Sequence, residues 1–365
     1  MIPYSSHYWF VFMAMCSFTC ALIMSLRNRS QMLRGNKFPV LGLILAVLCC
    51  WYVGVRPINK EGDSYLYSTV YNLTLHHKLT VETAMGNETE GFWAFVELSC
   101  LQARLSASQW FQIISAFYFV GFSIAIWKWM RRNFTSAFIF MISSMSFWAY
   151  ATNGLRSGMA ASLGTCALAF LTNAKSRKDL LSIGIAIALF FCSSLTHSSM
   201  WLFFAIAIMV WLKPTKKVTF YFWSVCLLLS PFISNLMLEQ ASTIFSDARL
   251  DYYSESDMSV FSRTGWRWDF ILYSAIPVIW SWYIINVRKL SDKTYLIISN
   301  VYVLCNSTWL LVNSVPYSNR FAYIGWCIYP FVLCYPLFKM NISKYQGAIG
   351  ASMMVFFTIL TLLLT

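Results

Sequence analysis

Charged residues are scarce in this chain: they make up 11% of its 365 residues, whereas hydrophobic residues make up 58%. Soluble domains contain about 25% charged residues. The mean hydropathy is +0.58. The chain therefore has too few polar side chains to cover a water-soluble domain, and the same shortage excludes an intrinsically disordered protein. The composition predicts an integral membrane protein.

Several motifs of common enzymes and pumps are also missing. The chain has no Gly-x-x-x-x-Gly-Lys-Ser/Thr loop, no His-Glu-x-x-His, no Gly-x-Ser-x-Gly and no Asp-x-Asp. An ATP-driven pump, an intramembrane metalloprotease of the common type and a serine hydrolase are therefore poor interpretations. There are four histidines, and none of the eleven cysteines forms a Cys-x-x-Cys pair. We expect neither a metal site nor a soluble cofactor.

Long apolar runs recur along the whole chain. They predict an all-α polytopic membrane protein with about 12 transmembrane helices, in a range of 10–13. The sixth and seventh runs are short, and they are also compatible with a hairpin that does not fully cross the membrane. The runs cover residues 8–25, 38–55, 109–127, 134–151, 157–173, 180–196, 198–212, 218–238, 270–287, 294–314, 320–338 and 347–365.

The net charge of the chain is +13. If successive spans cross the membrane in opposite directions, the loops and their charged residues fall into two sets, one on each face. The loops of one face hold 18 basic residues against the two acids Asp179 and Asp292, whereas the other face holds 9 basic and 12 acidic residues. Loops rich in lysine and arginine stay in the cytoplasm. The basic charge therefore indicates topology, and we do not expect nucleic acid as a partner. The N-terminus and the C-terminus are both predicted on the outer face.

Two long polar loops interrupt the single transmembrane domain predicted for residues 1–365. They cover residues 56–108 and 239–269, and both fall on the outer face. The first contains an apolar stretch from Gly91 that also carries Glu97 and Arg104, which favours a helix at the membrane surface. Long outer loops and short inner loops indicate that binding or chemistry takes place outside.

Four arginines lie at outer ends of predicted spans, where basic residues are usually rare. An arginine at the membrane boundary is costly unless it meets an anion, and its planar fork suits phosphate or diphosphate. Arg156 is flanked by small residues that let helices approach closely. The alternative is an arginine whose guanidinium reaches lipid head groups. The four residues are Arg56, Arg156, Arg267 and Arg320.

Three further groups lie on the outer face. Asp63 follows a glycine and precedes tyrosines suited to a sugar site, although such tyrosines also anchor ordinary loops at the interface. His197 lies among hydroxyl residues and is either a base or phosphate ligand, or a histidine bonded to a backbone carbonyl. Arg263 and Arg267 flank Trp266, either as a saccharide phosphate site or as part of an aromatic belt.

An ordered set of short motifs resembles the EpsG/Wzy-type polysaccharide polymerases of bacterial inner membranes. The motifs extend over most of the chain. Ser157 departs from the pattern, since many relatives carry glutamine there. The matching residues are Gly62, Asp63 and Tyr67, then Glu90, Gly91 and Phe92, then Asn153 and Arg156, then His197 and Ser199, then Arg320 and Tyr323.

The resemblance implies a glycosyltransferase that joins oligosaccharide repeat units at the periplasmic face of the inner membrane. Its donor and acceptor would be undecaprenyl-diphosphate-linked oligosaccharides, it would need no cofactor, and a chain-length regulator protein is implied as a partner. Arg156 and Arg320 would stabilise the diphosphate leaving group. Asp63 or His197 would orient or deprotonate the acceptor hydroxyl, with Glu90 a weaker candidate for this role.

The remaining candidates are expected to bind substrate. Tyrosine and tryptophan rings can stack on sugars, whereas arginine, asparagine and glutamate can bind phosphate or hydroxyl groups. This set comprises Arg56, Tyr65, Tyr67, Glu90, Trp93, Asn153, Arg263, Arg267 and Tyr323.

Other classes fit the sequence less well. A flippase for the same lipid-linked saccharide should carry charge along a central path, but the first, third, fifth and eighth spans are nearly free of charge. An O-antigen ligase would use similar outer arginines, and the sequence separates it poorly from a polymerase. A membrane acyltransferase usually has a deeper histidine than His197. A structural scaffold does not account for Arg156 and Arg320.

Overall fold

The structure is a computed structural model, and its described residues form helices and no strand. The described residues are 4–35, 39–58, 62–78, 80, 90–174, 176, 178–245, 266–290, 292–314 and 318–364. They divide into two compact units, one of residues 1–204 and 334–365 and the other of residues 205–333. The expectation of one transmembrane domain stays a prediction, and the two units are described separately.

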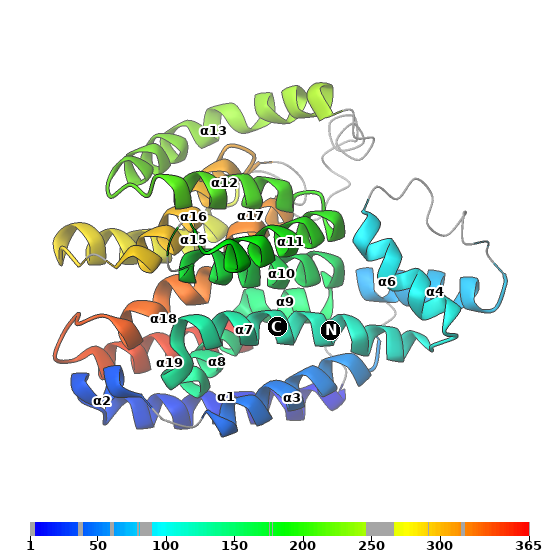
Figure 1. The fold of residues 1–365 in the computed structure, drawn as a ribbon, viewed down its shortest axis with the longest axis horizontal. Helices are drawn as coiled ribbons and strands as arrows, with labels where there is room; N and C mark the ends of the chain where they lie inside the picture. The colour runs from blue at the N-terminus through cyan, green and yellow to red at the C-terminus, as the bar shows by residue number, and fades with distance from the viewer. Residues whose placement is uncertain are drawn as a thin grey trace. The chain divides into compact units, whose positions relative to one another are not determined.

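The first unit contains most of the helices (Figure 1). The helix α12, Met200–Leu212, begins in this unit, and α18, Tyr329–Lys339, ends in it. Its other helices are α1 (Tyr4–Ser25), α2 (Arg29–Arg34), α3 (Val40–Val55), α4 (Asp63–Leu75), α6 (Gly91–Gln102), α7 (Ala107–Met130), the 3-10 turn η1 (Arg131–Asn133), α8 (Phe134–Ile142), α9 (Met145–Thr152), α10 (Leu155–Asn173), α11 (Leu180–Thr196) and α19 (Gln346–Leu364).

The second unit is built around α16, Lys293–Leu310, which packs against α13, α15 and α17. A column of buried polar side chains follows α16, and it includes Asn300 and Asn306. Asn300 accepts a hydrogen bond from Thr219, and Asn306 accepts one of 2.7 Å from the indole of Trp223. The remaining helices are α13 (Val218–Phe245), α15 (Trp268–Trp282), the π-helical turn η3 (Tyr283–Val287) and α17 (Asn319–Trp326).

Each of the twelve apolar runs falls on one helix or on two consecutive helices. The run 134–151 is divided between α8 and α9 at Ser143 and Ser144, because Ser143 ends one helix and extended backbone at Ser144 begins the next. Within the described residues, four helical segments are long and apolar enough to cross a membrane, and five shorter apolar helices accompany them. The chain is a multi-pass membrane protein, whereas the number of twelve spans stays a prediction. The four segments are Ala107–Ile142, Trp268–Val287, Phe321–Lys339 and Gln346–Leu363.

Small residues let α7, α10 and α11 pack closely in the first unit. A Cβ atom on Gly121 of α7 would lie 2.9 Å from the backbone oxygen of Ser162 on α10. On the other face of α10, Ser193 of α11 donates a hydrogen bond of 2.7 Å to the carbonyl of Ala160. Close backbone approach of this kind is how helices associate where the surroundings are as apolar as the side chains. The small residues after Arg156 therefore have the packing role that the sequence indicated.

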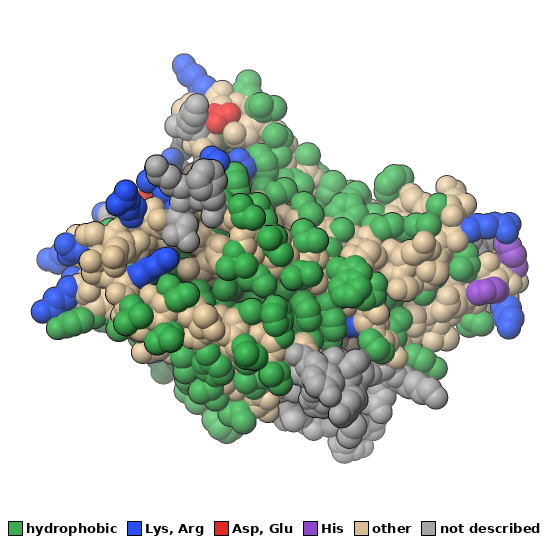
Figure 2. All heavy atoms as spheres, turned by 90° about the horizontal axis from the view of Figure 1, so that it is seen from below, with side chains coloured by type: hydrophobic (Ala, Val, Ile, Leu, Met, Phe, Trp, Pro, Cys, Tyr) green, Lys and Arg blue, Asp and Glu red, His purple; other side chains and the backbone are tan. Residues whose placement is uncertain are grey.

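The outward faces of α1 and α3 are apolar. Val11, Met15, Leu22, Val47 and Trp51 are each more than half exposed. Figure 2 shows hydrophobic side chains over the face that these helices form, with lysine and arginine side chains toward the end where α2 lies. An apolar surface of this extent is what lipid hydrocarbon covers in a membrane protein.

The contact at Gly121 gives a stability test. Gly121→Ala adds a methyl group where the α10 backbone already lies in contact with α7. We therefore expect the free energy of unfolding to fall by about 1–3 kcal/mol. Gly184→Ala on α11 is the matched control, because nothing lies within 4 Å of its added Cβ. The control should be neutral or more stable by up to about 1 kcal/mol, since alanine favours helix. Thermal unfolding of the purified protein in detergent measures both, and equal stability of the two variants would refute the close α7–α10 contact.

Candidate functional site

The site of the first unit is organised around the carboxylate of Glu90, which immediately precedes α6. Its side chain is 5% exposed. Its Oε2 lies 2.7 Å from Nη1 of Arg156, and its Oε1 lies 3.1 Å from Nδ1 of His197. The backbone N–H of Ser198 also donates to Oε1, at 3.0 Å. One buried carboxylate therefore joins an arginine and a histidine that are distant from each other in the sequence.

Helix ends position the three side chains. Arg156 is the second residue of α10, directly after the turn that ends α9. His197 follows the last residue of α11, and its backbone is extended, with φ −151° and ψ 119°. Because α10 packs on α11 and α11 packs on α6, these ends meet at one place. The side chains of Arg156 and His197 are 13% and 21% exposed, so both remain partly accessible to solvent.

Glu90 is ionised in this arrangement. Burial alone would raise its pKa, but the hydrogen bond and charge of His197, the charge of Arg156 and the Ser198 N–H together lower the pKa below its ordinary value of 4.5. A carboxylate on Nδ1 makes that nitrogen the donor, which leaves Nε2 of a neutral imidazole as an acceptor. The tautomer is assigned from this 3.1 Å approach of Oε1 to Nδ1. The geometry thus combines a fixed guanidinium with a histidine suited to accept a proton.

Backbone carbonyls and a hydroxyl group hold the guanidinium of Arg56. Its guanidinium donates to the backbone carbonyls of Val53 and Thr152 and, at 3.1 Å, to the hydroxyl of Ser64. Burial lowers the pKa of Arg56 to about 10, and the smaller electrostatic effect of Tyr52 raises it. The guanidinium therefore remains charged at neutral pH. Arg56 therefore ties the end of α3 to α4 and α9.

A second contact ties the start of α4 to the same turn. The side chain of Asn153 accepts a hydrogen bond of 3.0 Å from the backbone N–H of Asp63. Gly62 precedes it with φ +85°, and a Cβ there would lie 2.6 Å from Oδ1 of Asn153. Only glycine fits this conformation and this approach. Asp63 and Asn153 thus lie close together, at the turn that leads into Arg156.

The aromatic candidates separate into exposed and buried side chains. Tyr65 on α4 is 42% exposed. Tyr67 is half-buried, with its ring 5.5 Å from that of Trp93, and Trp93 is 3% exposed within an apolar cluster that includes Trp110. Trp93 therefore packs the core between α4, α6 and α7, and Tyr65 is the ring that offers a surface to a ligand.

The other candidates belong to the second unit or lie outside the described residues. Arg267 forms a two-point ion pair with Asp269, at 2.9 and 2.6 Å, and stacks on Phe270. Arg320 is the second residue of α17, and Tyr323 on the same helix packs against Trp326. Arg263 lies outside the described residues. Within the described residues, no group of three or more His, Cys, Asp or Glu side chains is placed to hold a metal ion.

Sequence reasoning underestimated Glu90 and missed Ser64, Thr152 and Ser198. The one local signal for Glu90 was an acidic residue directly before an apolar helical stretch, where a carboxylate is favoured by the helix dipole. Its partners lie 66 and 107 residues further along the chain, and no spacing rule connects them. Thr152 and Ser198 contribute backbone atoms, which carry no residue-type signal at all.

The sequence model of the EpsG family matches residues 38–365, which includes every residue of the Glu90 cluster and of the α4 turn. The chain belongs to the EpsG family. The family suggests a polysaccharide-polymerase type of function. No curated protein and no solved structure matches the chain.

The lowered pKa of Glu90 predicts how its contribution to stability depends on pH. Because the folded-state pKa lies below 4.5, the ion pairs stabilise the fold above that pH, and the stabilisation is lost as the pH falls through the folded-state pKa. Near neutral pH, Glu90→Gln should lower the free energy of unfolding by about 1–3 kcal/mol, since both partners are partly exposed.

Thermal unfolding of the wild type and of Glu90→Gln between about pH 3 and pH 8 measures this effect. The difference in stability between the wild type and Glu90→Gln should become smaller toward the acidic end of this pH range. Ser99→Ala, an uncharged change on the same helix α6, is the control, and its difference in stability from the wild type should not change with pH. A Glu90→Gln difference that stays constant over the whole range would contradict the ionised ion-pair network.

Proposed function

We propose that this protein is a polymerase that joins polyprenyl-diphosphate-linked oligosaccharide repeat units at the outer face of the inner membrane. The product would be an O-antigen or a related surface polysaccharide. The observation that carries the proposal is the Glu90 carboxylate holding Arg156 and His197 together at the ends of α6, α10 and α11. This arrangement supplies a cation for a diphosphate and a base for a hydroxyl group in one place.

The reaction transfers a glycosyl group between two lipid-linked saccharides. The acceptor hydroxyl oxygen forms a bond to C1 of the donor saccharide, and the bond between C1 and the diphosphate oxygen breaks. The electron pair of that bond leaves with the diphosphate, and the hydroxyl proton passes to a base. The reaction needs no nucleotide and no cofactor, because the diphosphate itself is the leaving group.

His197 is the base in this proposal. With Nδ1 facing the Glu90 carboxylate, its Nε2 accepts the proton of the acceptor hydroxyl, and the carboxylate stabilises the imidazolium that forms. Glu90 is then a positioning residue, not the base. Asp63 is half-buried at the start of α4, and Tyr65 on the same helix is exposed. We assign these two residues to the acceptor sugar, by hydrogen bonding and stacking.

Arg156 binds the diphosphate in this proposal. A guanidinium carries five N–H donors, and one contact to Glu90 fixes its orientation before the substrate arrives. Donors that are held in place ahead of the reaction stabilise developing charge without a cost of reorganisation. Arg320, Tyr323, Arg263 and Arg267 remain proposed substrate residues of the second unit, and a chain-length regulator remains a proposed partner.

Reporter fusions test the outer placement of this site. Alkaline phosphatase joined after Thr80 should be active, because we place that loop outside the cytoplasm, whereas a fusion after Thr215 should be inactive. Fusions to a cytoplasmic fluorescent reporter at the same positions should give the opposite pattern. An inactive phosphatase after Thr80 would place the Glu90 cluster on the wrong side for this reaction.

The polymerase activity is tested by the saccharide ladder of cells that lack this gene. The deletion strain should show only single repeat units, and the wild-type gene should restore the ladder. His197→Gln removes the base, Arg156→Lys keeps the charge but removes the fork, and Glu90→Gln releases both partners. Each should reduce long-chain material by about 100-fold at equal protein level. Glu97→Gln is the matched control and should restore a normal ladder.

Three outcomes in the deletion strain would overturn the proposal. A normal ladder in the deletion strain would remove the polymerase function. Repeat units that accumulate on the cytoplasmic side of the membrane would instead identify a flippase. Polymer of normal length that stays on its lipid carrier would identify an O-antigen ligase.

A further inference from the structure

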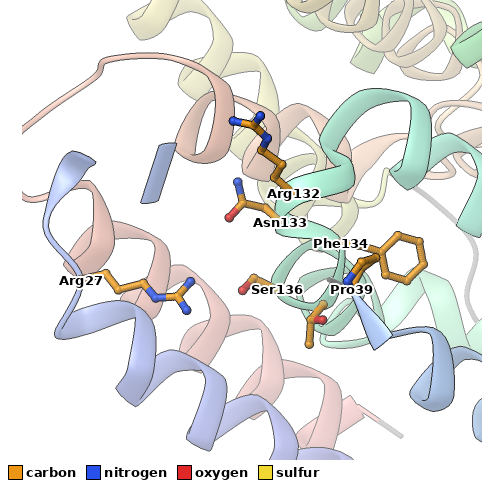
Figure 3. A pocket seen from close by; sticks show the side chains of 7 residues that line it. Arg27, Pro39, Arg132, Asn133, Phe134 and Ser136 are labelled. Carbon is orange, nitrogen blue, oxygen red and sulfur yellow. The ribbon is translucent and has the colours of Figure 1, made fainter. Parts of the chain in front are cut away.

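A small hollow lies in the first unit, between the end of α1, the start of α3 and the segment η1–α8. Arg27, Arg132, Asn133, Thr135 and Ser136 contribute to its lining. Figure 3 shows the Arg27 side chain directed toward Ser136, with Asn133 between Arg27 and Arg132. The space between these residues is about 190 Å³, a volume that includes open solvent. The hollow is small and open on one side.

Close packing fixes the walls of this hollow. Gly35, between α2 and α3, has φ +59°, and a Cβ there would lie 2.4 Å from the backbone oxygen of Arg132. The backbone N–H of Gly42 on α3 donates a hydrogen bond of 3.1 Å to the hydroxyl oxygen of Thr135. Neither Gly35 nor Gly42 has room for a side chain at its position. The arginine and hydroxyl groups are therefore carried by a backbone that is already in place.

Polar groups of the hollow have unused hydrogen-bonding capacity. Asn133 is 5% exposed, and its side-chain oxygen has no hydrogen-bond partner within the described part of the chain. A buried polar atom without a partner is costly, so the Asn133 oxygen is available to accept a hydrogen bond from a bound group. No ion pair or hydrogen bond of the Arg132 guanidinium occurs among the described residues. Thr135 accepts from Gly42, which leaves its hydroxyl proton to be donated.

Exposed apolar side chains lie next to residues of the hollow in the chain. Leu26 is 78% exposed, and Val40 and Leu41 are 56% and 61% exposed. They neighbour Arg27 and Pro39 in the chain, so a cationic rim meets a lipid-facing surface. This combination fits a molecule with a phosphate head and a hydrocarbon tail.

We propose that this hollow binds the phosphate group of an anionic membrane lipid in the inner leaflet. Arg27 and Arg132 supply the positive charge, and Thr135 donates a hydrogen bond to a phosphate oxygen. The buried oxygen of Asn133 accepts a hydrogen bond from a hydroxyl group of the head, so the site prefers a lipid such as phosphatidylglycerol to one with a quaternary ammonium group. The bound lipid joins α1, α3 and η1–α8. This proposal does not rest on the polymerase reaction.

Lipid binding to the full-length protein in detergent, measured by native mass spectrometry, tests the site. Phosphatidylglycerol should bind more tightly than phosphatidylcholine. Arg132→Gln and Arg27→Gln should each weaken phosphatidylglycerol binding by about tenfold. The matched control is Arg131→Gln, because the guanidinium of Arg131 lies over the ring of Trp127, 4.4 Å from its centroid, and does not line the hollow. The control should stay within about twofold of the wild type.

A second arm distinguishes lipid phosphate from free phosphate. Inorganic phosphate is added in place of chloride at equal ionic strength, and thermal stability is recorded for the wild type and Arg132→Gln. Stabilisation of the wild type alone by millimolar phosphate, without a preference for phosphatidylglycerol, would keep the phosphate site but assign it to the free anion. Equal binding of the two lipids with no effect of phosphate would overturn the proposal. An Arg131→Gln loss as large as that of Arg132→Gln would also overturn it.

Discussion

A buried carboxylate needs partners, and this constraint organises the part of the first unit where the ends of α6, α10 and α11 meet. Glu90 is removed from water at the edge of an apolar cluster, where an unpaired negative charge would be strongly unfavourable. Arg156, His197 and the Ser198 N–H satisfy it. Because Glu90, Arg156 and His197 belong to the ends of three different helices, the same interaction that stabilises the carboxylate also brings a guanidinium and an imidazole together. The proposed chemistry therefore uses an arrangement of side chains that the burial of Glu90 already requires.

Helix packing makes that interaction possible. The small residues of α10 let α7 and α11 approach its backbone, so the position of Arg156 is set by the bundle and not by a flexible loop. Arg56 and Asn153 then attach α4 to the turn before Arg156. Asp63 and Tyr65 are therefore carried by backbone that is held to the same turn. The result is a site on rigid elements, which is the arrangement that preorganised electrostatic stabilisation needs.

The sequence predicted the helices better than the contacts. The apolar runs located a helix at every expected span, and the small residues after Arg156 indicated close packing correctly. Arg56 and Trp93 show the limit of this reasoning. An arginine at a span end has the same composition signal whether it faces an anion or backbone carbonyls, and a tryptophan beside polar residues has the same signal whether it is exposed or buried. Glu90 was ranked low because its partners are visible only when α10 and α11 have packed. The break at Ser143 and Ser144 also depends on tertiary context.

Coupling between Glu90 and its two partners tests the central claim most directly. The rate of chain growth would be measured for Glu90→Gln, His197→Gln and Arg156→Gln alone, and for the first combined with each of the others. If Glu90 acts by holding these side chains, each double variant should lose far less activity than the product of the two single losses. Losses that multiply in both pairs would mean that Glu90 acts independently of Arg156 and His197, and would contradict the account.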